Sequence, residues 1–127
     1  MDLHQKTVLI VEDDTALRHA IEEELTRNDF TVFCAPDGLT GLELAYTIHP
    51  NLILLDLIMP GMGGSGFLTQ IRTDNWGATA RIIIMTNLPS ETKHRLATEL
   101  HVAGYFLKSN TPLNEIVSLV KNELEKS

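Results

Sequence analysis

Five short apolar runs divide the chain, and amphipathic segments separate them. The runs cover residues 7–11, 30–35, 52–56, 81–86 and 104–107. Continuous apolar runs of this length are typical of strands that are buried on both faces. Between and after them, apolar residues recur at helical spacing, which predicts helices over about 15–28, 38–50, 65–73, 90–100 and 112–124. Strands that alternate with helices predict an α/β fold, in which a parallel sheet carries helices on both faces.

Residues at the helix ends and along the helix faces add detail to this prediction. Asp14 is a suitable N-cap for the first helix, because its side chain can accept a free backbone N–H. Thr111 is predicted to cap the last helix, with Pro112 at the first helical position. The residues expected to face inward from the second helix are Leu39, Leu42, Ala45 and Ile48.

Composition narrows the class of protein without naming its function. A chain of 127 residues that is 43% hydrophobic and 21% charged predicts one globular domain over residues 1–127. The net charge of -7 argues against unspecific binding to nucleic acid or to an anionic membrane. No apolar run approaches membrane-spanning length, and the expectation is a soluble, cytoplasmic protein. Cys34 is the only cysteine, which excludes an internal disulfide, and it is expected to act as a small buried hydrophobe.

Polar residues end four of the five predicted strands. Glu12 and Asp13 follow the first strand, Asp56 ends the third, Thr86 the fourth, and Lys108 follows the fifth. In open parallel sheets, functional groups gather beyond the carboxyl ends of the strands. The four strand ends are therefore expected to form one site.

Three carboxylates at one site repel one another, by about 4 kcal/mol for a pair about 4 Å apart at an intermediate dielectric. A hard cation such as Mg²⁺ removes this repulsion, retains several waters and engages a phosphate. Asp13 and Asp56 are candidates for direct ligands, and Glu12 for a ligand through water. Lys108 and Thr86 then suit a phosphoryl group, as counter-charge and hydroxyl donor. A carboxylate beside a metal and a lysine can act as a nucleophile toward phosphorus.

Each of these residues also has a structural interpretation when it is taken alone. A role as helix cap is enough to explain Asp14, and an acidic cluster after a strand is commonly a solvated loop. Thr86 can cap a turn, Lys108 can be a surface charge, and Tyr105 can belong to the core. The coincidence of polar residues at four strand ends favours the functional interpretation.

Four motifs in this order carry a family resemblance. They are Val11-Glu12-Asp13-Asp14, Asp56-Leu57-Ile58-Met59-Pro60-Gly61, Met85-Thr86 and Gly104-Tyr105-Phe106-Leu107-Lys108. With them, nearly the whole chain resembles the response-regulator receiver domains of bacterial and archaeal two-component signalling, of the stand-alone, chemotaxis-regulator type. The resemblance implies a flavodoxin-like, doubly wound sheet of five parallel strands in the order 2-1-3-4-5. It also implies a signalling module that catalyses only its own phosphorylation and dephosphorylation.

The resemblance implies a role for each site residue. Asp56 would accept phosphate from a histidine kinase or phosphotransfer protein. Mg²⁺ would bind Asp13, Asp56 and the backbone carbonyl of Ile58, with Glu12 contributing through water. Thr86 and Tyr105 would form the switch pair, and Lys108 would be the counter-ion of the phosphate. The predicted helix over 90–100 has few apolar residues, so it is expected to move with Tyr105. No further module follows Ser127, so the expected output is an unidentified partner protein or a domain outside this sequence.

The chain departs from the family pattern at several positions. Receivers usually have a proline after the lysine, in a cis peptide, where this chain has Ser109. A cis peptide without proline costs about 3 kcal/mol, so either the loop bears that cost or the peptide is trans. Asn87 stands where a small residue usually follows the switch threonine, and it is expected to narrow access to the site. By the resemblance, the positions of Ile58 and Leu88 tune dephosphorylation, and their apolar side chains predict a long-lived phosphoryl state.

Two other functions share parts of this pattern. A Mg²⁺-dependent phosphatase of haloacid-dehalogenase type needs a second acid two residues after its nucleophile, where this chain has Ile58. A flavodoxin-like electron carrier needs a phosphate-binding loop rich in Gly, Ser and Thr after its first strand. Glu12, Asp13 and Asp14 would repel a phosphate there in the absence of a metal.

Overall fold

The computed structural model describes residues 6–87, 98 and 101–126. Within these residues the strands are β1 (Thr7–Val11), β2 (Thr31–Ala35), β3 (Leu52–Asp56), β4 (Ile82–Thr86) and β5 (Gly104–Leu107). The helices are α1 (Thr15–Arg27), α2 (Gly38–Ile48), α3 (Gly63–Arg72), the short 3₁₀ helix η1 (Gly77–Thr79) and α5 (Leu113–Glu125). The helix predicted over 90–100 and the residue Leu88 fall outside the described part of the chain, apart from position 98.

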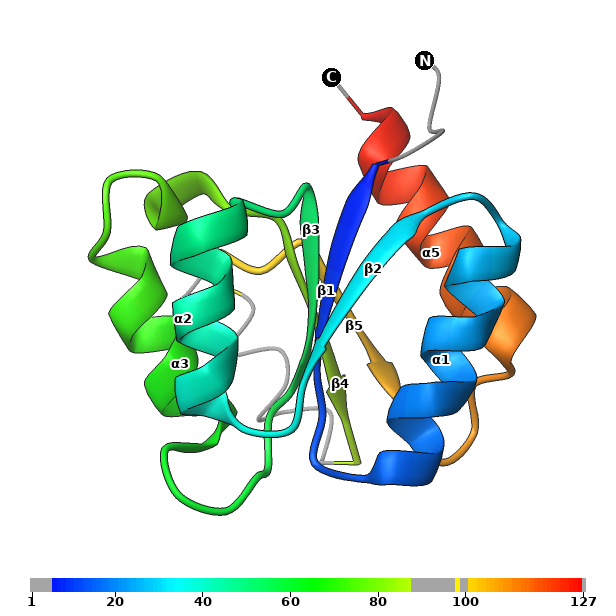
Figure 1. The fold of residues 1–127 in the computed structure, drawn as a ribbon, viewed down its shortest axis with the longest axis horizontal. Helices are drawn as coiled ribbons and strands as arrows, with labels where there is room; N and C mark the ends of the chain where they lie inside the picture. The colour runs from blue at the N-terminus through cyan, green and yellow to red at the C-terminus, as the bar shows by residue number, and fades with distance from the viewer. Residues whose placement is uncertain (1–5, 88–97, 99–100, 127) are drawn as a thin grey trace.

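The five strands form one parallel sheet in the order β2-β1-β3-β4-β5, which confirms the predicted topology. Helices α1 and α5 cover one face of this sheet, and α2 and α3 cover the other (Figure 1). Both faces of the central strands β1 and β3 are covered, and these strands are apolar except for Thr7 and Asp56. Residues 8–11 and 52–55 are all 0% exposed.

Two hydrophobic clusters lie on the two faces of the sheet. One joins residues of α1 and α5 to alternate residues of the strands, among them Ile21, Val120 and Leu54. The other joins α2 and α3 to the opposite face, with Leu42 and Phe67 at its centre. Alternate residues of β1, β3 and β4 contribute to opposite clusters, as the pleat of a strand requires. The sheet is thus held from both sides, and its strand ends are rigid supports for the loops that follow them.

The predictions for helix ends and faces need three corrections. Leu39 was expected to face inward, but it is 59% exposed, because α2 turns residues 38, 41, 42 and 45 toward the sheet. Helix α5 begins one residue later than predicted. Its N-cap is Pro112, whose carbonyl accepts the first helical N–H groups, and Thr111 provides no cap. Helix α3 begins at Gly63, two residues earlier than predicted.

The described helices include none that is both long enough and apolar enough to cross a membrane. Cys34 packs against the cluster of α1 and α5, but its free thiol is only partly buried, whereas the prediction was a buried residue. Burial, together with the nearby Glu22, raises the pKa of this thiol to about 11.

Candidate functional site

The carboxyl ends of four strands meet at one edge of the sheet. In the strand registers, Val11 pairs with Leu55, Asp56 with Met85, and Thr86 with Leu107. The residues that follow these pairs therefore emerge at the same level. The structure thus brings together Glu12, Asp13, Asp56, Thr86 and Lys108, as the sequence predicts.

Three carboxylates form the acidic part of the site. One oxygen from each of Glu12, Asp13 and Asp56 lies within 4.8 Å of the others. The side chain of Glu12 is 0% exposed and that of Asp56 is 1% exposed, whereas Asp13 is exposed. Buried carboxylates at this spacing are stable only with compensating groups.

Main-chain groups hold the two buried carboxylates in place. The N–H of Asp14 donates to Oε2 of Glu12 at 2.9 Å, and the N–H of Ile58 donates to Oδ1 of Asp56 at 3.2 Å. The Arg18 guanidinium donates to the backbone carbonyl of Glu12 at 2.8 Å and ties this loop to α1. Asp14 itself caps α1 by accepting the N–H of Leu17 at 3.1 Å, which confirms its structural role.

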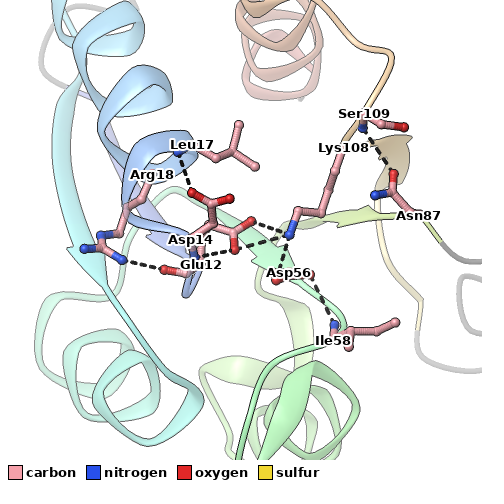
Figure 2. Close-up of polar contacts among 9 residues, drawn as sticks. All are labelled: Glu12, Asp14, Leu17, Arg18, Asp56, Ile58, Asn87, Lys108 and Ser109. Carbon is pink, nitrogen blue, oxygen red and sulfur yellow. Dashed lines mark hydrogen bonds and ion pairs between the residues drawn. The ribbon is translucent and has the colours of Figure 1, made fainter.

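Lys108 reaches from the end of β5 into the space between Glu12 and Asp56 (Figure 2). Its Nζ lies 3.0 Å from Oε1 and 3.3 Å from Oε2 of Glu12, and 3.1 Å from Oδ2 of Asp56. One ammonium therefore compensates two buried carboxylates and leaves Asp13 without an ion pair among the described residues. The site retains an excess of negative charge that a cation would neutralise.

The pKa values of the four charged groups reflect this crowding. Burial raises the pKa of Glu12 to about 7, against the opposing hydrogen bonds from Asp14 and Lys108. Burial likewise raises the pKa of Asp56, although contacts with Glu12 and Lys108 oppose it. Burial acts to raise the pKa of Asp13, but interactions with Glu12 and Asp56 outweigh it, and this pKa lies below its ordinary value. Burial acts to lower the pKa of Lys108, but the carboxylates outweigh it and raise that pKa.

The donor set fits a hard divalent cation. Three carboxylates converge, and Oε1 of Glu12 is buried but receives no hydrogen bond from the residues that the structure describes. Its contact with Lys108 at 3.0 Å lacks the alignment of a hydrogen bond. A buried acceptor without a donor is costly, and a metal-bound water would satisfy it.

Two features of the site were not foreseen from the sequence. Arg18 supports the acidic loop, and its helical position four residues after Asp14 is the signal that could have indicated this. Gly64, the second residue of α3, lies directly behind the end of β3, where a Cβ would lie 2.5 Å from both the carbonyl oxygen of Asp56 and Cα of Leu57. The helix predicted over 65–73 begins after this glycine and leaves it outside. It is instead the residue that lets α3 approach the end of the strand.

The other two strand ends carry the remaining predicted residues. Thr86 is 1% exposed at the end of β4, and Tyr105 is 39% exposed on β5. The peptide after Lys108 is trans, because no described peptide bond is cis. The N–H of Ser109 donates to Oδ1 of Asn87 at 3.1 Å. Two of the positions at which the chain departs from the family pattern, 87 and 109, are thus in contact.

Comparison with known proteins identifies the family. The model of the response regulator receiver domain matches residues 8–121, and the chain belongs to this family. Transcriptional regulatory protein RstA of Escherichia coli is 32% identical over 106 residues, which cover 84% of this chain and 43% of RstA. The chain spans between 41% and 52% of the length of the first curated relatives that it matches.

Solved structures agree with this assignment. The BeF3-activated N-terminal receiver domain of Klebsiella pneumoniae RstA has a TM-score of 0.83 and 28% identity, over 94% of this chain and 99% of that one. Chemotaxis protein CheY4 of Vibrio cholerae has a TM-score of 0.86 at 21% identity, over 93% of this chain and 98% of that one, and it supports the fold alone. The chain is a phosphorylatable signalling receiver of two-component type, and the phosphatase alternative finds no support.

Proposed function

We propose that Asp56 is the phosphoryl acceptor of this receiver and that the reaction depends on Mg²⁺. The observation that carries the proposal is the position of Asp56. Its carboxylate is 1% exposed at the end of a buried strand, with Lys108 at 3.1 Å and two more carboxylates beside it. A carboxylate at this position serves no packing purpose, and it is costly unless its charge is used.

In the reaction, an oxygen of Asp56 attacks the phosphorus of a phosphohistidine. The bond between phosphorus and the donor nitrogen breaks, and its electron pair leaves with the nitrogen. The product is an acyl phosphate on Asp56. Backbone N–H donation from Ile58 to Oδ1 at 3.2 Å orients the carboxylate for this attack.

The cation site follows from the carboxylates. Asp13 and Asp56 would hold Mg²⁺ together with the backbone carbonyl of Ile58, and Glu12 would accept from a metal-bound water. When bound, Mg²⁺ supplies charge neutralisation for the transferred phosphoryl oxygens. The exposed side chain of Asp13 supports this assignment, because it leaves the site open to a phosphodonor.

Lys108 and Thr86 complete the phosphoryl pocket in this proposal. Lys108 now lies between two carboxylates, and it would move its contact from Asp56 to a phosphoryl oxygen. Thr86 would donate its hydroxyl to a second oxygen, and Tyr105 would respond as the other member of the switch pair. Two features support these roles. Thr86 is buried at the end of β4, beside the end of β5 that carries Lys108, and the N–H of Lys108 donates to the carbonyl of Thr86 at 3.2 Å.

The chain would then act as a signalling module, and not as an enzyme that converts a separate substrate. Ile58 is 61% exposed and apolar at the position where a phosphatase would carry its second acid. A histidine kinase or phosphotransfer protein is the proposed donor, and a protein surface is the proposed output. The protein would work in the cytoplasm, where ATP-dependent kinases obtain their phosphoryl groups. Residues 1–127 would form one receiver domain, since the family model leaves only short ends unmatched.

The test uses acetyl phosphate as a small phosphodonor. Wild type, Asp56→Asn and Asp37→Asn are incubated with the donor and Mg²⁺, and intact mass is measured. Asp37 is a matched control, because it is a partly exposed cap of α2 and asparagine caps equally well. One phosphoryl group should appear on wild type and Asp37→Asn, none on Asp56→Asn, and none on any of them after chelation of Mg²⁺. Equal labelling of Asp56→Asn would refute the assignment.

A further inference from the structure

The contact between Asn87 and Ser109 joins two loops of the site. Asn87 directly follows Thr86, and Ser109 directly follows Lys108. Oδ1 of Asn87 accepts the N–H of Ser109 at 3.1 Å, across 22 positions of sequence (Figure 2). Each residue of the pair is thus adjacent to a residue that is proposed to touch the phosphoryl group.

This contact extends the pairing of β4 and β5 beyond the end of the sheet. The N–H of Lys108 donates to the carbonyl of Thr86 at 3.2 Å, and the next N–H along the chain, that of Ser109, goes to the side chain of Asn87. The peptide between Lys108 and Ser109 is trans and keeps an N–H to donate. A proline at position 109 would have no such donor, and a small apolar residue at position 87 would have no acceptor.

The orientation of this peptide determines where the Lys108 side chain starts. That side chain ends at 3.0 to 3.3 Å from two different carboxylates, so a small rotation at its base would lose one of the contacts. We propose that Asn87 is a positioning residue for Lys108, and that it acts by accepting the N–H of Ser109. The inference rests on the proposed function, because it concerns how the Lys108 side chain is directed toward a phosphoryl group on Asp56.

The test is a double-mutant cycle with a matched control. Asn87→Ala removes the acceptor, Ser109→Pro removes the donor, and the double variant removes both. Ser109→Ala is the control, because it deletes the hydroxyl and retains the N–H. Each protein is assayed for its phosphorylation rate with acetyl phosphate and Mg²⁺. Its affinities for Mg²⁺ and for beryllofluoride in saturating Mg²⁺, and its melting temperature, are also measured.

Asn87→Ala should react about threefold to tenfold more slowly, the range expected for the loss of one hydrogen bond. Its affinity for beryllofluoride should fall by a similar factor, while its Mg²⁺ affinity and melting temperature stay close to those of wild type. This split separates positioning of Lys108 from a general structural role, which would change all four quantities. Ser109→Ala should react at the wild-type rate. Addition of Ser109→Pro to Asn87→Ala should slow phosphorylation little further.

Three results would overturn the inference. They are an unchanged rate in Asn87→Ala, a loss in Ser109→Ala as large as that in Asn87→Ala, or full additivity of Asn87→Ala and Ser109→Pro. If Ser109→Pro does not fold, the first two comparisons still decide the matter. Failure of the inference is distinguishable from failure of the proposed function. If only the inference fails, wild type is still labelled on Asp56. If the proposed function fails, wild type is not labelled on Asp56, and the proposed function and the inference are both overturned.

Discussion

The two halves of the site differ in how firmly the fold holds them. The acidic half comprises Glu12, Asp13 and Asp56, at the ends of the central strands β1 and β3. Its two buried carboxylates each accept a main-chain N–H. The β4–β5 half comprises Thr86 and Lys108, and an exposed hydrogen bond from the N–H of Ser109 to Asn87 joins the two loops that follow them. In the proposed function, the acidic half supplies the phosphoryl acceptor and the metal ligands, and the β4–β5 half adjusts how fast the transfer proceeds.

The largest effect is expected where α3 supports the acidic half. A Cβ on Gly64 would lie 2.5 Å from the backbone of Asp56 and Leu57, and backbone atoms cannot move aside cheaply. Gly64→Ala should therefore lower the free energy of unfolding by about 3 kcal/mol, as overpacking does. Gly66→Ala is the control, because its Cβ would approach only the flexible side chain of Met62, at 2.9 Å. Urea unfolding measures both, and equal stability of the two variants would contradict this account of the support.

The next effect concerns the exposed member of the acidic half. Asp13→Ala should weaken Mg²⁺ binding by about tenfold or more, because it removes a charged ligand. It should leave metal-free stability unchanged or slightly higher, because it also removes repulsion. Asp14→Ala is the neighbouring control, and it should lose about 1 kcal/mol of stability with its helix cap while keeping its Mg²⁺ affinity. Calorimetric titration distinguishes them, and an unchanged Mg²⁺ affinity in Asp13→Ala would exclude it as a ligand.

A smaller effect on the stability of the fold is expected from a change of pH, and it should appear only in the absence of metal. The pKa of Glu12 is raised from 4.5 to about 7 in the folded state, and that of Asp56 is also raised. The folded protein therefore binds more protons than the unfolded chain in this window, so its stability is highest below about pH 4.5 and falls as pH rises toward about 7. The lowered pKa of Asp13 acts in the opposite direction, at more acidic pH.

Urea midpoints at about pH 5 and about pH 8, with chelator and with Mg²⁺, measure this dependence. Mg²⁺ should restore stability mainly at the higher pH, where the carboxylates are charged. Glu12→Gln should flatten the metal-free profile. A metal-free stability that rises over this range would contradict the burial of the acidic half.

The smallest effect concerns the lifetime of the phosphoryl group. Ile58 is apolar and 61% exposed beside Asp56, so it offers no acceptor to an attacking water. Ile58→Asn should shorten the lifetime several-fold, and Ile58→Val should leave it nearly unchanged. Loss of label after removal of the phosphodonor measures both rates. If Ile58→Asn and wild type lose phosphate equally fast, the exclusion of water by this residue has no effect on the rate.

The acidic half was predictable from the sequence because each of its residues follows a buried apolar run. Runs of that kind predict where the strands end. Because the carboxyl ends of parallel strands lie at one edge of the sheet, the polar side chains that follow them are expected to lie close together. The β4–β5 half was predictable only in part. Asn87 and Ser109 were recognised as departures from the family pattern, but their contact depends on the trans peptide after Lys108. No local pattern predicts that geometry.

The helix details failed for a similar reason. Leu39 was predicted to lie on the inward face of α2, but close packing of Gly41 against Val11 and Phe67 determines how the helix is turned. Thr111 and Pro112 both suit a helix start, and local propensity does not decide between them. In each case the deciding contact is made by residues that are distant in the sequence or by the backbone itself.

The central claim is that the phosphoryl group resides on Asp56, and chemical trapping tests it most directly. Wild type is phosphorylated with acetyl phosphate and Mg²⁺ and then reduced with borohydride, which converts an aspartyl phosphate to homoserine. Peptide mass spectrometry then locates the modified residue. The account predicts homoserine at position 56 and unmodified aspartate at positions 13 and 14. Homoserine at either of those positions with unmodified Asp56, or no homoserine in a protein that carries a phosphoryl group, would contradict it.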